Sequence, residues 1–247
     1  LLQSSAFAKY LNIYKKKSTN SKIVTQLLFG ENFKKIKKYK SWIKIKNNED
    51  NYEGYIKNKK FPLDLKNTHK VSSLCSNIYS KPNNKNRVKM KLSFGSKIKV
   101  LKKSGNYYKF EKYWIKRNCV KKINFKSKNI FHEVTKFKNI KYKWGGKSFR
   151  GIDCSALVQL FFNFNNKFCP RDTEDQIKYF KKKISLKNVA KNDLIFWKGH
   201  VALAISKKNL IHAYGPLKKV VIMPIIKTIT RIHQTADLKV IGVRRIQ

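Results

Sequence analysis

One cysteine and one histidine in the second half of the chain have the residue types and surroundings needed for nucleophilic catalysis. Cys154 follows a Gly-Ile-Asp segment and opens an apolar stretch, residues 154–162, that is typical of a buried helix. A helix start offers free backbone N–H groups and the positive end of the dipole, which favour a thiolate and can hold an oxyanion. His200 opens a strand-like apolar segment and can take the thiol proton. We therefore predict Cys154 as nucleophile and His200 as its base.

A second histidine is predicted to orient the first. A hairpin centred on Ser206 would set His212 directly opposite His200, with Cβ atoms about 5 Å apart. His212 would then hold His200 in the right tautomer, the role that a carboxylate plays in serine triads. Taken singly, a cysteine at a helix start or a histidine in a strand is more often only a buried residue. The prediction therefore depends on the three residues together.

The elements that must position these residues follow one another from about residue 130. Asp153 is predicted to cap the helix at 154–162, and a short helix is expected after Pro170. Helices placed before a run of strands favour an α+β domain. The expected elements are a helix at 131–138 and strands at 193–197, 200–205, 210–213, 220–226 and 240–243.

The first half of the chain contains a weak internal repeat with an offset of 65 residues. Leu27-Leu28-Phe29-Gly30 aligns with Leu92-Ser93-Phe94-Gly95, and each copy continues into short alternating segments. Short strands separated by turns predict two small all-β barrels. The expected domains are residues 1–66, 67–125 and 126–247, joined by linkers at 62–68 and 121–129.

The composition is that of a globular but strongly basic protein. Hydrophobic residues make up 41%, and 58 basic against 13 acidic residues give a net charge of +45. Both halves are basic and no nucleic-acid-binding motif accompanies the charge, so we expect no specific nucleic-acid partner and only non-specific binding at low salt. The longest apolar run, residues 220–226, is too short to cross a membrane.

The four cysteines do not indicate a metal site or a disulfide framework. They stand at positions 75, 119, 154 and 169, without the close spacing of zinc ligands, and are few for a chain of this length. We therefore expect neither metal nor organic cofactor. No signal peptide pattern is visible and a reactive thiol must stay reduced, which together favour the cytoplasm; a truncated N-terminus would leave export open.

Five short blocks stand in a recognisable order in the second half of the chain. They are Tyr142-Lys143-Trp144-Gly145-Gly146, Gly151-Ile152-Asp153-Cys154-Ser155, Pro170-Arg171-Asp172 with Gln176, Asn192 to Trp197 with Gly199-His200-Val201, and Ile211-His212-Ala213. In this order and spacing they resemble the NlpC/P60 family of cell-wall cysteine peptidases over about residues 130–245. The upstream repeats resemble the bacterial SH3-like domains of some members, and the arrangement is most similar to that of γ-D-glutamyl-L-diamino-acid endopeptidases.

The resemblance implies a role for individual residues. Cys154, His200 and His212 match the family's catalytic triad. Four further positions match substrate contacts: Tyr142 near the thiol, Asp153 and Ser155 beside it, and Thr173 where members carry serine.

In such members the first barrel closes one end of the cleft and binds the free amine of an N-terminal L-alanine. A carboxylate is the natural partner of an ammonium group. Glu31 is the predicted carboxylate and Tyr52 the accompanying hydroxyl; a solvated glutamate and a packed tyrosine are equally compatible with the sequence.

The resemblance thus implies an endopeptidase that cuts the γ-D-glutamyl–diamino acid amide of peptidoglycan peptides through a thioester, working as a monomer. Three alternatives stay open. They are a wall-peptide-binding SH3 module with a weak or inactive catalytic domain, an amidase or acyltransferase on the same fold, and a nucleic-acid binder driven by charge.

Overall fold

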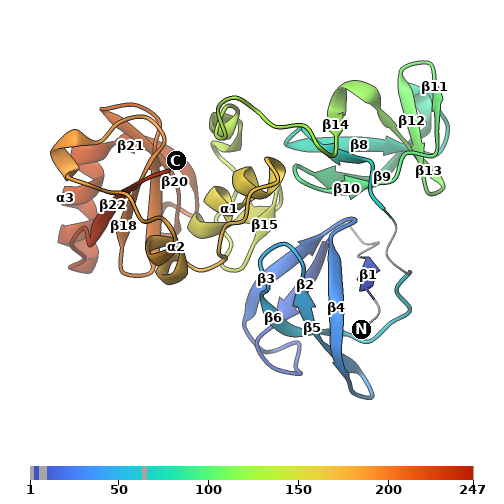
Figure 1. The fold of residues 1–247 in the computed structure, drawn as a ribbon, viewed down its shortest axis with the longest axis horizontal. Coiled ribbons are helices and arrows are strands. Elements are labelled where there is room, and N and C mark those ends of the chain that lie inside the picture. The colour runs from blue at the N-terminus through green and yellow to red at the C-terminus, as the bar shows by residue number, and fades with distance from the viewer. Residues whose placement is uncertain (1–2, 6–9, 63–65, 247) are drawn as a thin grey trace.

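The computed structural model describes residues 3–5, 10–62 and 66–246. Three bodies follow one another along the chain: an N-terminal all-β body, a second all-β body, and a C-terminal body that holds the helices α1 to α3 (Figure 1). This is the α+β architecture with two preceding barrels that the sequence predicts. No helix among the described residues has the length and apolar character of a membrane span.

The first barrel is a single sheet with the order β1-β4-β5-β6-β2-β3. Its strands alternate, so that in β5 Ile43 and Ile45 are buried while Lys44 and Lys46 are not. The buried side chains form one small core with Leu27 and Phe33. The strands are β1 (Gln3–Ser5), β2 (Tyr10–Tyr14), β3 (Ile23–Leu28), β4 (Asn32–Lys38), β5 (Trp42–Asn47) and β6 (Glu53–Lys57).

The second barrel has a three-stranded sheet, β10-β7-β14, and a five-stranded sheet, β11-β12-β13-β8-β9, around a core of its own. Gly30 and Gly95, the glycines of the repeat, both have left-handed backbones, with φ of 76° and 84°. A side chain at Gly30 would also collide with the backbone of Lys97 in the second barrel. The strands are β7 (His69–Val71), β8 (Cys75–Tyr79), β9 (Arg87–Ser93), β10 (Lys97–Ile98), β11 (Lys102–Ser104), β12 (Tyr107–Phe110), β13 (Tyr113–Lys116) and β14 (Val120–Lys122).

The C-terminal body is a six-stranded antiparallel sheet, β17-β22-β18-β19-β20-β21, between helices. Side chains on one face, such as Phe196 and Leu203, pack with α1, and those on the other face, such as Ile195 and Ala204, pack with α3. The elements are β15 (Lys147–Ser148), β16 (Gly151–Ile152), α1 (Cys154–Phe164), α2 (Thr173–Tyr179), β17 (Lys183–Ile184), β18 (Asp193–Trp197), β19 (His200–Ala204), β20 (Asn209–Tyr214), β21 (Lys219–Pro224), α3 (Ile225–Ala236) and β22 (Gly242–Arg245).

Two sequence expectations in this body are wrong. The helix expected at 131–138 is only a 3₁₀ turn, Val134–Phe137. The strand expected at 220–226 ends at Pro224, and the next residues form α3, whose Ile225 and Ile232 cover the second face of the sheet. Pro224 has no N–H to continue the ladder, and its φ of −62° suits a helix start.

Candidate active site

Cys154 is the first residue of α1, and Asp153 is its N-cap as predicted. One carboxylate oxygen of Asp153 accepts from the N–H of Ala156 at 2.9 Å, and the other accepts from the N–H of Gly145 at 2.8 Å. The thiol is therefore held at the positive end of a capped helix.

The groups around the thiol of Cys154 shift its pKa in opposite directions. Burial, and secondly the charge of Asp153, raise the pKa of Cys154 to about 12, while the N–H groups of Val201 and Ser155 and the Arg171 guanidinium act in the opposite direction. The resting group is a neutral thiol, so a base must remove its proton during attack. The N–H of Val201 that points at the sulfur belongs to the residue after His200, which places the start of β19 beside the nucleophile.

His200 and His212 are in direct contact: Nε2 of His200 lies 2.9 Å from Nδ1 of His212. The predicted register is wrong, because Leu203 pairs with Ile211, which leaves the two histidines diagonal rather than directly opposite. Both side chains still project from the same face of the sheet, and their rings meet between the two diagonal positions.

Burial lowers the pKa of His200 to about 4. Burial and the neighbouring His200 lower the pKa of His212 to about 3. Both imidazoles are therefore neutral near pH 7, and His200 can act as a base. The ring of Tyr214 stacks on His212 with an angle of 12° between the ring planes, and this contact holds the orientation of the His212 imidazole.

A cavity of about 270 Å³ opens in front of the thiol. Its walls come from both the C-terminal body and the first barrel, which contributes Val24 and Tyr52. The cavity is acidic in character although the protein is basic, because it collects three of the 13 carboxylates. The lining residues are Val24, Tyr52, Tyr142, Trp144, Asp153, Cys154, Ser155, Arg171, Asp172, Thr173, Glu174 and Gly199.

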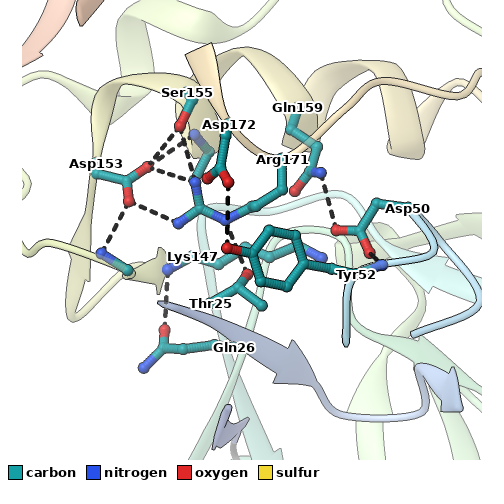
Figure 2. Close-up of polar contacts among 12 residues, drawn as sticks. Thr25, Gln26, Asp50, Tyr52, Lys147, Asp153, Ser155, Gln159, Arg171 and Asp172 are labelled. Atoms are coloured by element: carbon teal, nitrogen blue, oxygen red, sulfur yellow. Dashed lines mark hydrogen bonds and ion pairs between the residues drawn. The ribbon is translucent and has the colours of Figure 1, made fainter. Parts of the chain in front are cut away.

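Arg171 lines this cavity and connects several of the polar side chains around it by hydrogen bonds (Figure 2). Its guanidinium donates to both carboxylate oxygens of Asp153, at 3.0 and 2.6 Å, and to the hydroxyl of Ser155 at 2.8 Å. Its Nε donates to Thr25 of the first barrel at 2.8 Å. Arg171 stands inside a recognised motif, but nothing local in the sequence shows that it pairs with Asp153 eighteen residues earlier.

Tyr52 and Asp172 join the first barrel to the C-terminal body at one end of the cavity. The hydroxyl of Tyr52 donates to Oδ2 of Asp172 at 3.1 Å (Figure 2). Burial, and then the charge of Asp172, raise the pKa of Tyr52 to about 12, so the phenol keeps its proton. Asp50 accepts hydrogen bonds from Gln159 and from the backbone N–H of Tyr52, both at 3.0 Å, and so fixes the loop that carries the tyrosine.

The structure brings most of the predicted residues together at the cavity, which is lined by Tyr52, Tyr142, Asp153, Cys154, Ser155 and Thr173. His200 and His212 are not among the lining residues, but Gly199, the neighbour of His200, is. Burial, and then the nearby Cys154 and Asp153, raise the pKa of Tyr142, which keeps its phenol proton available as a donor. Trp144 and Asp172, which received no role from the sequence, also line the cavity.

Glu31 does not reach this cavity, so its predicted place in the site must be corrected. It is 2% exposed, and its carboxylate accepts from Nζ of Lys147 at 2.8 Å and from the N–H of Leu28 at 2.9 Å. An ammonium group of a ligand would have to displace a buried lysine. Glu31 instead joins the first barrel to β15.

Within the part of the chain that the structure describes, no cluster of three or more histidine, cysteine or carboxylate side chains has the arrangement of a metal site.

The comparisons with known proteins agree with this geometry. Residues 139–238 match the NlpC/P60 family, and residues 9–60 match the bacterial SH3 domain. The chain is 24% identical over 237 residues to a gamma-D-glutamyl-L-lysine dipeptidyl-peptidase of Bacillus subtilis, covering 85% of this chain and 79% of that protein. It is 34% identical over 85 residues to dipeptidyl-peptidase 6 of Lysinibacillus sphaericus, a match that covers 34% of this chain and 31% of the relative's length.

The fold has a counterpart over its whole length. The crystal structure of an NlpC/P60 family protein from Bacillus cereus ATCC 10987 superposes with a TM-score of 0.81 at 19% identity, covering 98% of this chain and 99% of the other. The capped thiol and the paired histidines lie in the part of the chain that matches the NlpC/P60 family, so residues 139–238 form an NlpC/P60 domain, preceded at residues 9–60 by a bacterial SH3 domain.

Proposed function

We propose that this peptidase cuts the amide between γ-D-glutamate and a diamino acid in short peptidoglycan peptides whose N-terminal amine is free. The hydrolase class is supported by the NlpC/P60 match over residues 139–238. The bond is supported by two Bacillus relatives that are gamma-D-glutamyl-L-lysine dipeptidyl-peptidases, at 24% and 23% identity. The observation that carries the proposal is the barrel wall at the end of the catalytic cavity, where Tyr52 is bonded to Asp172.

The histidine contact defines the tautomers that the reaction needs. If Nε2 of His200 carries the proton and donates to Nδ1 of His212, then Nδ1 of His200 has a free lone pair for the thiol proton. The opposite tautomer would leave His200 unable to accept. His212 is therefore the orienting residue, an acceptor in place of a carboxylate.

In the reaction the sulfur of Cys154 attacks the amide carbon while His200 takes its proton. The charge on the resulting tetrahedral oxygen would be held by backbone N–H groups at the start of α1 and by the phenol of Tyr142. His200 then gives the proton to the leaving amine, and the C–N bond breaks to leave a thioester on Cys154. Water, deprotonated by the same imidazole, releases the acid and restores the thiol.

Tyr52 and Asp172, here called the end wall of the cavity, would recognise the substrate amine. Asp172 offers a carboxylate beside the phenol oxygen of Tyr52, and an ammonium group can pair with both oxygens. A longer chain beyond this amine would meet the first barrel. The role that the sequence assigned to Glu31 is thus proposed for Asp172, and the assignment to Tyr52 is kept. A cytoplasmic location remains a prediction.

The test is mass spectrometry of L-Ala-γ-D-Glu-L-Lys and L-Ala-γ-D-Glu-meso-diaminopimelate after incubation with reduced protein, beside the Cys154→Ala variant. Release of L-Ala-D-Glu by the wild type alone is the expected result. The same peptides with an acetylated N-terminus should be cut at least tenfold more slowly. Cleavage of neither peptide would contradict the substrate assignment, and equal cleavage of the acetylated forms would contradict the amine site alone.

A further inference from the structure

A second cavity lies apart from the catalytic one. It has a volume of about 690 Å³ and lies between the second barrel and the C-terminal body, at the end of α1 opposite to Cys154. It shares no lining residue with the catalytic cavity. Its size is typical of a site for a small organic ligand at a domain boundary.

Six of the 15 residues that line this cavity are aliphatic or aromatic. Three of them, Phe94, Phe161 and Phe164, are here called the phenylalanine floor, and the rings of Phe94 and Phe164 stack at 4.5 Å between centroids. Leu74, Ile130 and the partly exposed Phe125 are the other three, and these side chains offer apolar contacts to a hydrocarbon chain.

The charged lining residues, here called the rim, are Lys121, Lys136 and one carboxylate, Glu133. Glu133 is already paired with Lys136 at 2.6 Å. Lys121 has an aromatic contact with Phe125, 5.5 Å from the ring centroid, and no carboxylate partner appears in the described ion pairs. An anionic head group therefore complements this rim better than a cation does.

A buried lysine joins two residues of the cavity lining. Lys70 is 1% exposed, and its Nζ donates to the backbone carbonyls of Phe125, at 2.7 Å, and Phe164. It also donates to the side chain of Asn166 at 3.2 Å. The second barrel is thus tied to the end of α1 beside the cavity.

We propose that this cavity is a second binding site, independent of the chemistry at Cys154, for an amphipathic anion: a hydrocarbon chain with a carboxylate or phosphate head. The chain lies on the phenylalanine floor and the head group lies at Lys121 and Lys136.

Cys75 lines the cavity and Cys119 of the same barrel does not, although both are partly exposed free thiols. The experiment is N-ethylmaleimide labelling of the whole protein at 150 mM salt, with the rate at each cysteine read by peptide mass spectrometry. The probes are decanoate, decyl phosphate, decanol and sodium phosphate, below micelle-forming concentrations. Decanoate or decyl phosphate should slow labelling of Cys75 at least fivefold and leave Cys119 unchanged. Whichever of decanoate and decyl phosphate slows labelling of Cys75 more shows whether the site prefers a carboxylate or a phosphate head group.

Chain length provides a second readout, since each added CH₂ that becomes buried should strengthen protection about fourfold from hexanoate to decanoate. Lys121→Glu should weaken protection at least fivefold, whereas Lys122→Glu on the same strand should not. Phe125→Ala should also weaken it, whereas Phe168→Ala, an exposed phenylalanine elsewhere, should not. Equal protection by decanol or by phosphate alone, equal protection of Cys119, or no protection at millimolar probe would each overturn the proposal.

Discussion

Arg171 and Asp153 form a buried two-bonded ion pair directly beside the nucleophile, with nitrogen–oxygen distances of 2.6 and 3.0 Å. The same carboxylate caps α1, so the pair ties the start of the catalytic helix to the segment that leads into α2. Arg171 is 3% exposed and Asp153 6%, so removal of either partner leaves the other charge largely buried and unpaired.

Arg171→Ala is therefore expected to lower the free energy of unfolding by about 3–5 kcal/mol, because Asp153 would remain buried without its partner. Arg150→Ala, at an exposed arginine of the same domain, should change it by less than about 0.5 kcal/mol. Urea denaturation measures both. Equal effects of the two substitutions would show that the ion pair does not hold this region.

The two histidines should respond differently to substitution. His200→Ala is expected to lower kcat by about 10²- to 10⁴-fold, since it removes the base. His212→Asn retains an acceptor oxygen and should lose much less activity than His212→Leu, which has none. Steady-state kinetics with the proposed tripeptide measure the three variants, and similar kcat values for His212→Leu and wild type would contradict the orienting role.

Acid should destabilise the protein through its buried histidines. The pKa of His212 is lowered from 6.5 to about 3 by burial, so below pH 6.5 the unfolded chain gains a proton that the folded chain does not. Stability from this residue is complete above pH 6.5 and falls by about 2 kcal/mol at pH 5. Thermal unfolding of the wild type and of His212→Asn at pH 7.5 and 5 measures the effect; the variant should lose less, and identical losses would refute the argument.

Tyr52→Phe should raise KM for the free-amine tripeptide roughly two- to tenfold, because one hydroxyl contact at the end wall is lost. KM for the N-acetylated peptide should change little. Tyr55→Phe, three residues further along the same barrel, is the matched control. A kcat effect without a KM effect would place Tyr52 outside substrate recognition.

Glu31→Gln should destabilise the fold without a selective effect on the substrate amine. Its partner Lys147 is fully buried, and an unpaired buried charge costs about 3–5 kcal/mol. Glu53→Gln, at the exposed pair with Lys44, should cost less than about 1 kcal/mol. Urea denaturation and KM values for free and acetylated peptides are the measurements. An unchanged stability with a raised KM for the free amine would restore Glu31 to the site.

The repeated barrels and the catalytic segment were predictable from the sequence because their signals are local. Asp153 before an apolar run specifies a capped helix that begins at Cys154, and a Phe-Gly pair repeated at residues 30 and 95 marks two turns of the same kind. Helix α3 was missed because its isoleucines and threonines favour strands locally. Only packing of one face against the sheet makes this segment a helix.

The sequence by itself therefore predicted a nucleophile, two histidines and the order of the domains, since each prediction depends on residue type and short-range pattern. The tertiary structure decided which charged side chains pair with one another and which line the cavity. Glu31 and Asp172 are both carboxylates near a predicted site, and only the packing of the first barrel buries one against Lys147 and leaves the other beside Tyr52 in the cavity. Contacts over 116 and 120 residues of chain depend on how two domains pack, and no local pattern encodes them.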